Sequence, residues 1–202
     1  MATNDWRGVW RRLTQRGAYP HQFAFLLLLP LRSVIFSPCQ LVSRLQLAET
    51  SRVLELGPGP GFFSERVARS IPGGHLYLVD LQHQMLARAR RRVRRAGLRN
   101  VSFTQATATV LPFEPGSFDT VFLVAVLGEV PDAGACVESV CHVLRHGGML
   151  SVTELPGDPD LIREPDLIAL VCAKGFEHLE SFPVMGRGYT ANFRKAVFRG
   201  TA

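Results

Sequence analysis

A strand, a glycine-rich turn and a helix are expected to follow one another between residues 53 and 70. The apolar strand residues give way to glycines at every second position, which are Gly57, Gly59 and Gly61. Glycine readily adopts a positive φ in a sharp turn, and because it has no side chain, a ligand can approach its backbone closely. In an α/β sheet, such a segment builds a ligand site at the carboxyl end of a strand. The alternative is a structural turn between any strand and helix.

Strand-like and helix-like segments alternate from residue 52 onward. Strands are expected at 52–56, 75–80, 100–104, 118–124, 149–154, 176–182 and 189–198. Helices are expected at 62–70, 83–96, 133–144 and 166–174. This alternation predicts an α/β fold, a doubly wound and mostly parallel seven-stranded sheet with helices on both faces. We expect it to occupy residues 51–202, after an N-terminal helical extension or lid at 1–50, in which Ser37-Pro38 predicts a helix start.

The residues around the turn narrow the choice of ligand. A dinucleotide fingerprint, G-x-G-x-x-G, has its third glycine one residue later, where this chain has Phe62. Glu55 precedes the turn, and a carboxylate there disfavours a pyrophosphate but suits a cationic ligand. Asp80 ends the second predicted strand, where a carboxylate can accept hydrogen bonds from ribose hydroxyls. Asp80 therefore favours a nucleoside ligand, with a helix cap near His83 as its alternative role.

Residues 55–61 resemble motif I of the class I S-adenosylmethionine (SAM) methyltransferases, commonly written E/D-x-G-x-G-x-G. The resemblance implies that Glu55 lies near the methionine amino end of SAM and that Gly57, Gly59 and Gly61 pack against the cofactor. It continues in the correct order to about residue 154. The chain is most similar to the methyltransferase type 11, UbiE-like branch, whose substrates are small molecules.

Two further segments of the resemblance concern the cofactor. Residues 104–113 resemble the segment that follows the third strand in the family, with Ala108 among the matching positions. Thr107 stands where many members have an aspartate that contacts the adenine amino group. The resemblance implies that Asp80, Leu81, Thr107 and Ala108 belong to the cofactor site.

Glu129 is the candidate catalytic residue. It follows residues 116–122, which resemble the family's F-D-x-V strand, and it comes after Gly128, where many relatives have histidine. The resemblance places Glu129 beside the reacting methyl group, where it could act as a general base or orient a substrate amine. The alternative is a surface carboxylate. Glu154, at the end of the fifth predicted strand, is a weaker candidate.

The resemblance implies an enzyme that transfers a methyl group from SAM to a small, apolar or amphipathic acceptor. Two other classes stay open: a SAM-binding or interaction module without catalysis, and a nicotinamide-dependent oxidoreductase, which the glycine spacing disfavours. No metal site is expected, because the cysteines form no C-x-x-C pair and no histidine stands at metal spacing from them. The oligomeric state is not indicated.

The net charge of +6 comes largely from one short arginine-rich segment. Its members are Arg88, Arg90, Arg91, Arg92, Arg94, Arg95 and Arg99. A helix would place them on the solvent side of a stripe of small and apolar residues. A solvated face is the plain interpretation, and acidic lipids, nucleic acid or an acidic partner are the alternatives. No nucleic-acid-reading motif accompanies them, which argues against nucleic acid.

The most apolar run, residues 22–31, is shorter than the about 20 residues needed to cross a bilayer. We interpret residues 19–36 as a lid that shapes the acceptor pocket. A peripheral membrane contact and a packed core helix are the alternatives. The first twelve residues do not have the pattern of a signal peptide, so a cytoplasmic location is expected.

Overall fold

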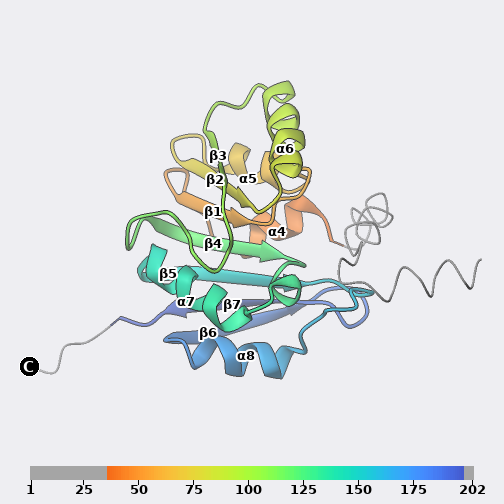
Figure 1. Cartoon of the computed structure of the whole chain (residues 1–202), viewed down its shortest axis with the longest axis vertical. Coiled ribbons are helices and arrows are strands. Elements are labelled where there is room, and N and C mark those ends of the chain that lie inside the picture. Colours follow the sequence, from red (N-terminus) through yellow and green to blue (C-terminus); the bar gives the residue numbers. More distant parts are fainter. Residues whose placement is uncertain (1–35, 198–202) are drawn as a thin grey trace, which may run out of the picture. The chain divides into compact units, whose positions relative to one another are not determined.

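The computed structural model describes residues 36–197. Its seven strands form one sheet in the order β3-β2-β1-β4-β5-β7-β6 (Figure 1). The strands are β1 (Arg52–Leu56), β2 (His75–Asp80), β3 (Val101–Gln105), β4 (Phe118–Val124), β5 (Leu144–Glu154), β6 (Phe176–Pro183) and β7 (Tyr189–Lys195). Strands β1 to β5 pair in parallel, whereas β7 is antiparallel to both β5 and β6. The predicted fold class is confirmed.

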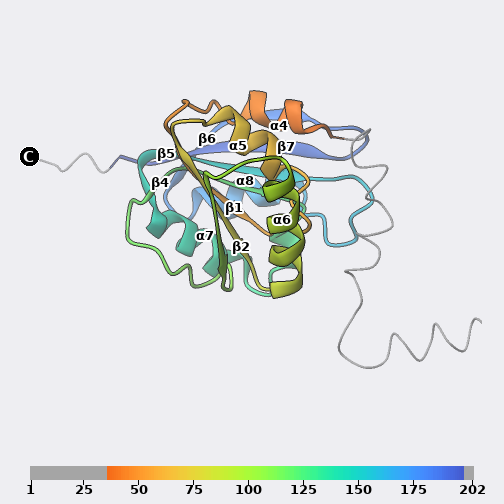
Figure 2. The same ribbon diagram turned by 90° about the horizontal axis from the view of Figure 1, so that it is seen from above.

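Helices cover both faces of this sheet. They are α4 (Pro38–Arg44), α5 (Ser64–Ser70), α6 (His83–Arg95), the 3₁₀ helix η1 (Leu127–Glu129), α7 (Ala133–Val143) and α8 (Glu164–Cys172). Helices α4, α5 and α6 form one layer, and α7 and α8 form the layer on the opposite face (Figure 2). Because the central strands are covered on both faces, they are apolar along almost their whole length, as in β4.

Helix α4 begins where the sequence predicts it. The Gln40 N–H donates to Ser37 Oγ over 3.2 Å, and the Ser37 N–H donates to Gln40 Oε1 over 2.9 Å. This reciprocal pair is a capping box, with Pro38 at the first helical position. Residues 36–50 belong to the same compact unit as the sheet, whereas the proposed lid and the apolar run lie, apart from Phe36, outside the described residues. The boundary at residue 50 stays a prediction.

Arg44, at the end of α4, joins this helix to the last two strands. Its Nη1 donates to Thr190 Oγ1 over 2.7 Å, and its Nη2 donates to the Pro183 carbonyl oxygen over 3.1 Å. The guanidinium also lies over the rings of Phe36 and Phe182, at 5.0 and 5.2 Å from their centroids. Burial lowers the pKa of Arg44. The contacts fix α4 against the β6–β7 hairpin.

Several predicted boundaries shift by a few residues in the structure, and two of the differences have a clear local cause. The fifth strand already begins at Leu144, because Leu144 pairs with Phe118 across an irregularity in the register of β4. Helix α5 begins at Ser64 and not at Phe62, because the Gly61 N–H donates to the Pro58 carbonyl oxygen and closes a turn first. Neither difference moves the carboxyl ends of the strands.

Arg44→Met is expected to lower the free energy of unfolding by about 2 kcal/mol, because it removes two charge-assisted hydrogen bonds. Arg163→Met is the matched control, since the Arg163 side chain makes one ion pair, with Asp166 at the surface, and its loss should cost less than about 1 kcal/mol. Urea unfolding of both variants measures the difference. Equal losses would contradict a special role for Arg44.

Candidate functional site

The carboxyl ends of the parallel strands meet at one edge of the sheet. The strand order reverses between β1 and β4, since β2 lies on one side of β1 and β4 on the other. Such a switch point leaves a crevice beyond the strand ends, where α/β proteins bind ligands. The structure brings the predicted residues of β1, β2 and the turn after β3 to this edge, together with the loop after β4.

The glycine turn after β1 needs glycine for two separate reasons. Gly57, Gly59 and Gly61 all have positive φ angles, of 63°, 53° and 78°. A Cβ at Gly57 would also lie 2.5 Å from Val126 Cγ2, and one at Gly61 would lie 3.0 Å from the Cβ of Ala89 on α6. The predicted positive φ is therefore confirmed, and the turn packs directly on the loop after β4 and on α6.

Glu55 lies beneath this turn. Its side chain is 3% exposed and accepts a hydrogen bond of 2.6 Å from the Ser64 hydroxyl at the start of α5. Burial is the main reason that the pKa of Glu55 rises to about 8; the nearby Asp80 adds to the rise, and the Ser64 hydrogen bond opposes it. The proposed contact of Glu55 with a cofactor stays a prediction.

Asp80 links the end of β2 to the glycine turn. Its Oδ1 accepts from the Gln82 N–H over 2.8 Å, and its Oδ2 accepts from the Gly59 N–H over 3.3 Å. Partial burial raises the pKa of Asp80, and these two hydrogen bonds oppose the rise. The N-cap residue of α6 is Gln82, and no side chain makes a capping hydrogen bond there. The alternative interpretation of Asp80 as the cap of this helix is therefore wrong. The next residue, Leu81, is 69% exposed.

Thr107 and Ala108 lie in the turn after β3. Thr107 is exposed, and its Oγ1 lies 2.9 Å from Thr109 Oγ1 and accepts from the Thr109 N–H over 3.3 Å. Ala108 is half-buried and packs against the core. The Ala106 N–H donates to the Asp80 carbonyl oxygen, which places the start of this turn beside the end of β2.

Two carboxyl groups lie near this edge, one in the loop after β4 and one at the end of β5. Glu129 is exposed on η1, whereas Glu154, the last residue of β5, is only 1% exposed. Burial is the main reason that the pKa of Glu154 rises to about 8; Asp158 and Glu129 add to the rise, and a hydrogen bond from the Ile162 backbone opposes it. Glu154 Oε1 has no hydrogen-bond partner among residues 36–197. Glu154 is therefore a stronger candidate for a functional residue than its position in the sequence alone indicated.

The loop between β5 and α8 explains why glycine precedes Glu129. A Cβ at Gly128 would clash with the carbonyl oxygen of Asp160. A histidine at position 128, as in many relatives, would displace this loop. Glycine at position 128 is therefore required by the close packing of the loops after β4 and β5 as the structure has them.

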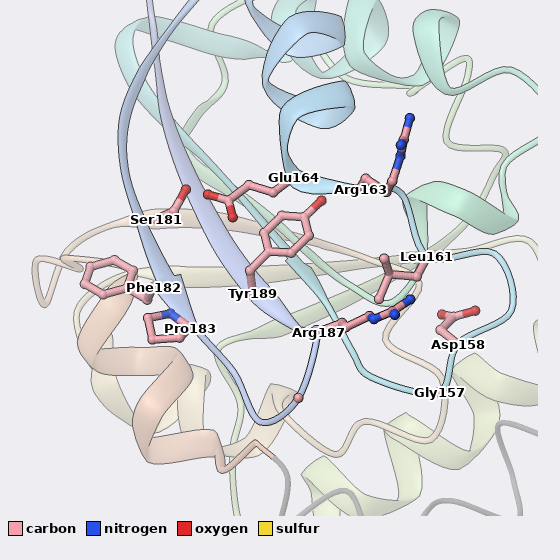
Figure 3. A pocket seen from close by; sticks show the side chains of 12 residues that line it. Gly157, Asp158, Leu161, Arg163, Glu164, Ser181, Phe182, Pro183, Arg187 and Tyr189 are labelled. Carbon is pink, nitrogen blue, oxygen red and sulfur yellow. The ribbon is translucent and has the colours of Figure 1, made fainter.

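A pocket of about 840 Å³ lies beside the end of β5, between the β5–α8 loop and the β6–β7 turn. Figure 3 shows Tyr189 between Phe182 on one side and Leu161 on the other. The Tyr189 hydroxyl donates to the Ile162 carbonyl oxygen over 2.7 Å, and Tyr189 pairs with Glu154 across the sheet. This pocket was not predicted from the sequence, in which the glycines flanking Arg187 in the β6–β7 turn are its one local signal.

The pocket is of a size that suits a small molecule. None of the predicted cofactor residues lines it, so it forms a second compartment along the same edge of the sheet. Within the described part of the chain, no three histidine, cysteine, aspartate or glutamate side chains group closely enough to hold a metal ion.

Residues 53–148 match a family model described as a methyltransferase domain. A ubiquinone/menaquinone biosynthesis C-methyltransferase of Pasteurella multocida is 36% identical over 105 residues, which cover 51% of this chain and 39% of that protein. A ubiquinone biosynthesis O-methyltransferase of Xanthomonas euvesicatoria is 31% identical over 144 residues, covering 69% of this chain and 59% of that protein. The chain thus spans roughly two to three fifths of the length of these relatives.

Two solved structures share the fold. A SAM-dependent methyltransferase from Aquifex aeolicus superposes with a TM-score of 0.80 at 19% identity, covering 89% of this chain and 100% of that one. The [4+2]-cyclase SpnF superposes with a TM-score of 0.72 at 22% identity, covering 79% and 80%. At these identities the likeness concerns the fold alone, which is also the fold of a protein named as a cyclase.

Glu154→Gln is expected to reduce the loss of stability that accompanies rising pH. The folded-state pKa of Glu154 is near 8 against an ordinary value of 4.5, so its contribution is fully present below about 4.5 and is lost as pH rises towards 8. Glutamine keeps the shape and the hydrogen bond but has no proton to lose. Urea unfolding between about pH 5 and pH 8 measures the slope.

Glu138→Gln is the matched control, because Glu138 is 61% exposed and pairs with Lys174 at the surface. It should leave the slope of stability against pH unchanged. Glu55 keeps its own share of the slope in both variants. If both variants show the same slope of stability against pH as the unmodified chain, this would contradict a raised pKa for the buried carboxyl group of Glu154.

Proposed function

The chain belongs to the class I SAM-dependent methyltransferases, and we propose that it transfers the methyl group of SAM to a small, apolar or amphipathic acceptor. SAM is the cofactor of this family. One observation carries the proposal: the glycine turn, the buried Glu55 and the half-buried Asp80 meet at the switch point of the sheet.

The residues of the turn fit a nucleoside with a cationic tail. An ionised carboxylate has about four lone-pair sites, and Asp80 uses two of them for Gly59 and Gln82, which leaves others for ribose hydroxyls. The exposed Leu81 offers an apolar surface to the adenine, beside Thr107 and Ala108. The charge of Glu55, once ionised, would favour the ammonium group of the methionine end.

Bound SAM supplies a methyl group that its sulfonium already activates. The task of the chain is to position the acceptor and exclude water, and such positioning can supply about 7–11 kcal/mol. We propose Glu129 as the group that accepts a proton or orients an amine where the acceptor requires it. Glu154 lies close enough to Glu129 for the charge of Glu129 to add to the rise in the pKa of Glu154, after the larger effects of burial and Asp158.

We propose the pocket beside Tyr189 as the place for the acceptor body. It adjoins the end of β5, and its lining combines aromatic, apolar and charged side chains. Methyltransferases of ubiquinone biosynthesis are among the relatives, which supports a ring-shaped, quinone-like acceptor. The related methyltransferases are longer than this chain. Their substrates therefore guide only the choice of the first acceptors to test.

A SAM-binding module without methyl transfer is the second candidate. The same fold is found in a protein named as a [4+2]-cyclase, and Thr107 replaces the aspartate that many methyltransferases carry. A nicotinamide oxidoreductase has less support, because the glycine spacing of the turn departs from the dinucleotide fingerprint.

Peripheral membrane contact also stays a proposal. No helix of the described residues is long and apolar enough to cross a bilayer. The apolar run at 22–31 lies outside those residues, and among the described elements the arginine-rich α6 is the one that we propose for such a contact.

Calorimetry is expected to show binding of SAM and S-adenosylhomocysteine but not of NAD. Asp80→Ala should weaken SAM binding by about 1–3 kcal/mol, roughly 5- to 150-fold in Kd, because ribose hydroxyls lose a charged acceptor. Asp119→Ala is the control. Asp119 accepts hydrogen bonds from Arg52 and Arg145 at the start of β4, away from the carboxyl ends, so its loss should lower stability and leave the Kd unchanged.

An unchanged SAM affinity in Asp80→Ala would contradict the proposed cofactor site. Folded protein that gives no heat with SAM would contradict the whole proposal. Transfer of labelled methyl groups to quinone-like, amine and lipid-like acceptors then separates the two candidates, since a SAM-binding module shows binding without turnover.

A further inference from the structure

Four arginines share one face of α6. Arg88, Arg91, Arg92 and Arg95 are spaced by three, four and seven residues, which places them together on a helix. The opposite, buried face of α6 consists of Leu86, Ala89 and Val93. With Pro60, Glu65 and Ala96, the four arginines line a hollow of about 730 Å³. The hollow begins at the glycine turn and lies between α5 and α6.

The arginines of this hollow carry more positive charge than the neighbouring carboxylate neutralises. Its one carboxylate, Glu65, lies 3.1 Å from Arg69 and 3.8 Å from Arg92. The side chains of Arg88, Arg91 and Arg95 make no hydrogen bond or ion pair with any residue in the range 36–197. Like charges three and four residues apart on a helix destabilise it. An anion in the hollow would remove this repulsion.

The arginine side chains that line the hollow are suited to bind phosphate groups that lie side by side on an extended surface. Guanidinium groups bind phosphate through two parallel hydrogen bonds. The row from Arg88 to Arg95 extends over roughly 10 Å, at 1.5 Å per residue, so it can contact several phosphates in one plane. No aromatic side chain lines the hollow, and the nearby ring of Phe62 is already paired with Arg92, whose guanidinium lies 5.6 Å from its centroid, so the lining offers no free ring on which the bases of a single-stranded nucleic acid could stack.

We propose that this arginine face of α6 binds the phosphate headgroups of an anionic membrane surface. The sequence contains a second membrane signal, the apolar run at residues 22–31. Surface binding usually needs two weak signals together, one apolar and one basic. The proposal goes beyond methyl transfer, and its test needs neither an acceptor nor turnover.

Co-sedimentation of the full chain with vesicles tests the proposal. The chain should bind vesicles of phosphatidylglycerol and phosphatidylcholine, should not bind pure phosphatidylcholine, and should bind more weakly as salt rises. The combined variant Arg88→Gln, Arg91→Gln, Arg95→Gln should lower partitioning about a hundredfold, at roughly fivefold for each arginine. Its SAM affinity should stay unchanged, which separates this test from that of the proposed function.

The control changes three exposed arginines elsewhere, as Arg145→Gln, Arg163→Gln and Arg194→Gln; Arg145 and Arg163 lose ion pairs with Asp119 and Asp166, so the folding of the control is checked first. It alters the net charge equally and should leave most of the vesicle binding. If the glutamine variant of α6 does not fold, lysine at the same three positions should fold and retain only part of the binding, since lysine lacks the bidentate geometry.

Three results would overturn the proposal. The first is that the chain does not bind anionic vesicles, and the second is that the variants of α6 and of the control lose binding equally. A single-stranded RNA that displaces the chain from vesicles, and whose own binding depends on the three arginines of α6, would identify nucleic acid as the occupant instead.

Discussion

The close packing of the glycine turn is the constraint on which the candidate site depends. Gly57 leaves no room for a Cβ against Val126, and Gly61 leaves little against Ala89. The turn is therefore held between the loop after β4 and helix α6, while the Gly59 N–H reaches Asp80. The glycine turn, the loop after β4 and helix α6 are far apart in the sequence. They are fixed relative to one another because glycine lets the backbone of the turn approach its neighbours closely.

Buried carboxyl groups are the second property of this edge. Glu55 and Glu154 each lie almost wholly out of solvent, and burial raises the pKa of both to about 8. Buried carboxyl groups with a raised pKa lower the free energy of unfolding at neutral pH. The presence of two such groups at the ends of β1 and β5 therefore fits a functional role for this edge of the sheet better than a purely structural one. A cationic ligand near Glu55 would lower its pKa again and release a proton on binding.

Local patterns predicted the fold because its elements are regular. Apolar runs identified the strands, helical spacing identified the helices, and Ser37 with Pro38 marked the start of α4. The burial of Glu154 and the packing of Gly128 on Asp160 were not predictable in this way. Both arise between loops that meet only in the folded chain. The pocket beside Tyr189 was missed for the same reason, since its walls come from two distant connections.

The central claim is that the glycine turn and Asp80 hold SAM at the switch point of the sheet. A crystal structure of the complex with S-adenosylhomocysteine tests it most directly. It should show the ribose hydroxyls within about 3 Å of the Asp80 carboxylate and the cofactor lying against the glycine turn. A ligand bound at another edge of the sheet, with Asp80 contacting only Gly59 and Gln82, would contradict the claim.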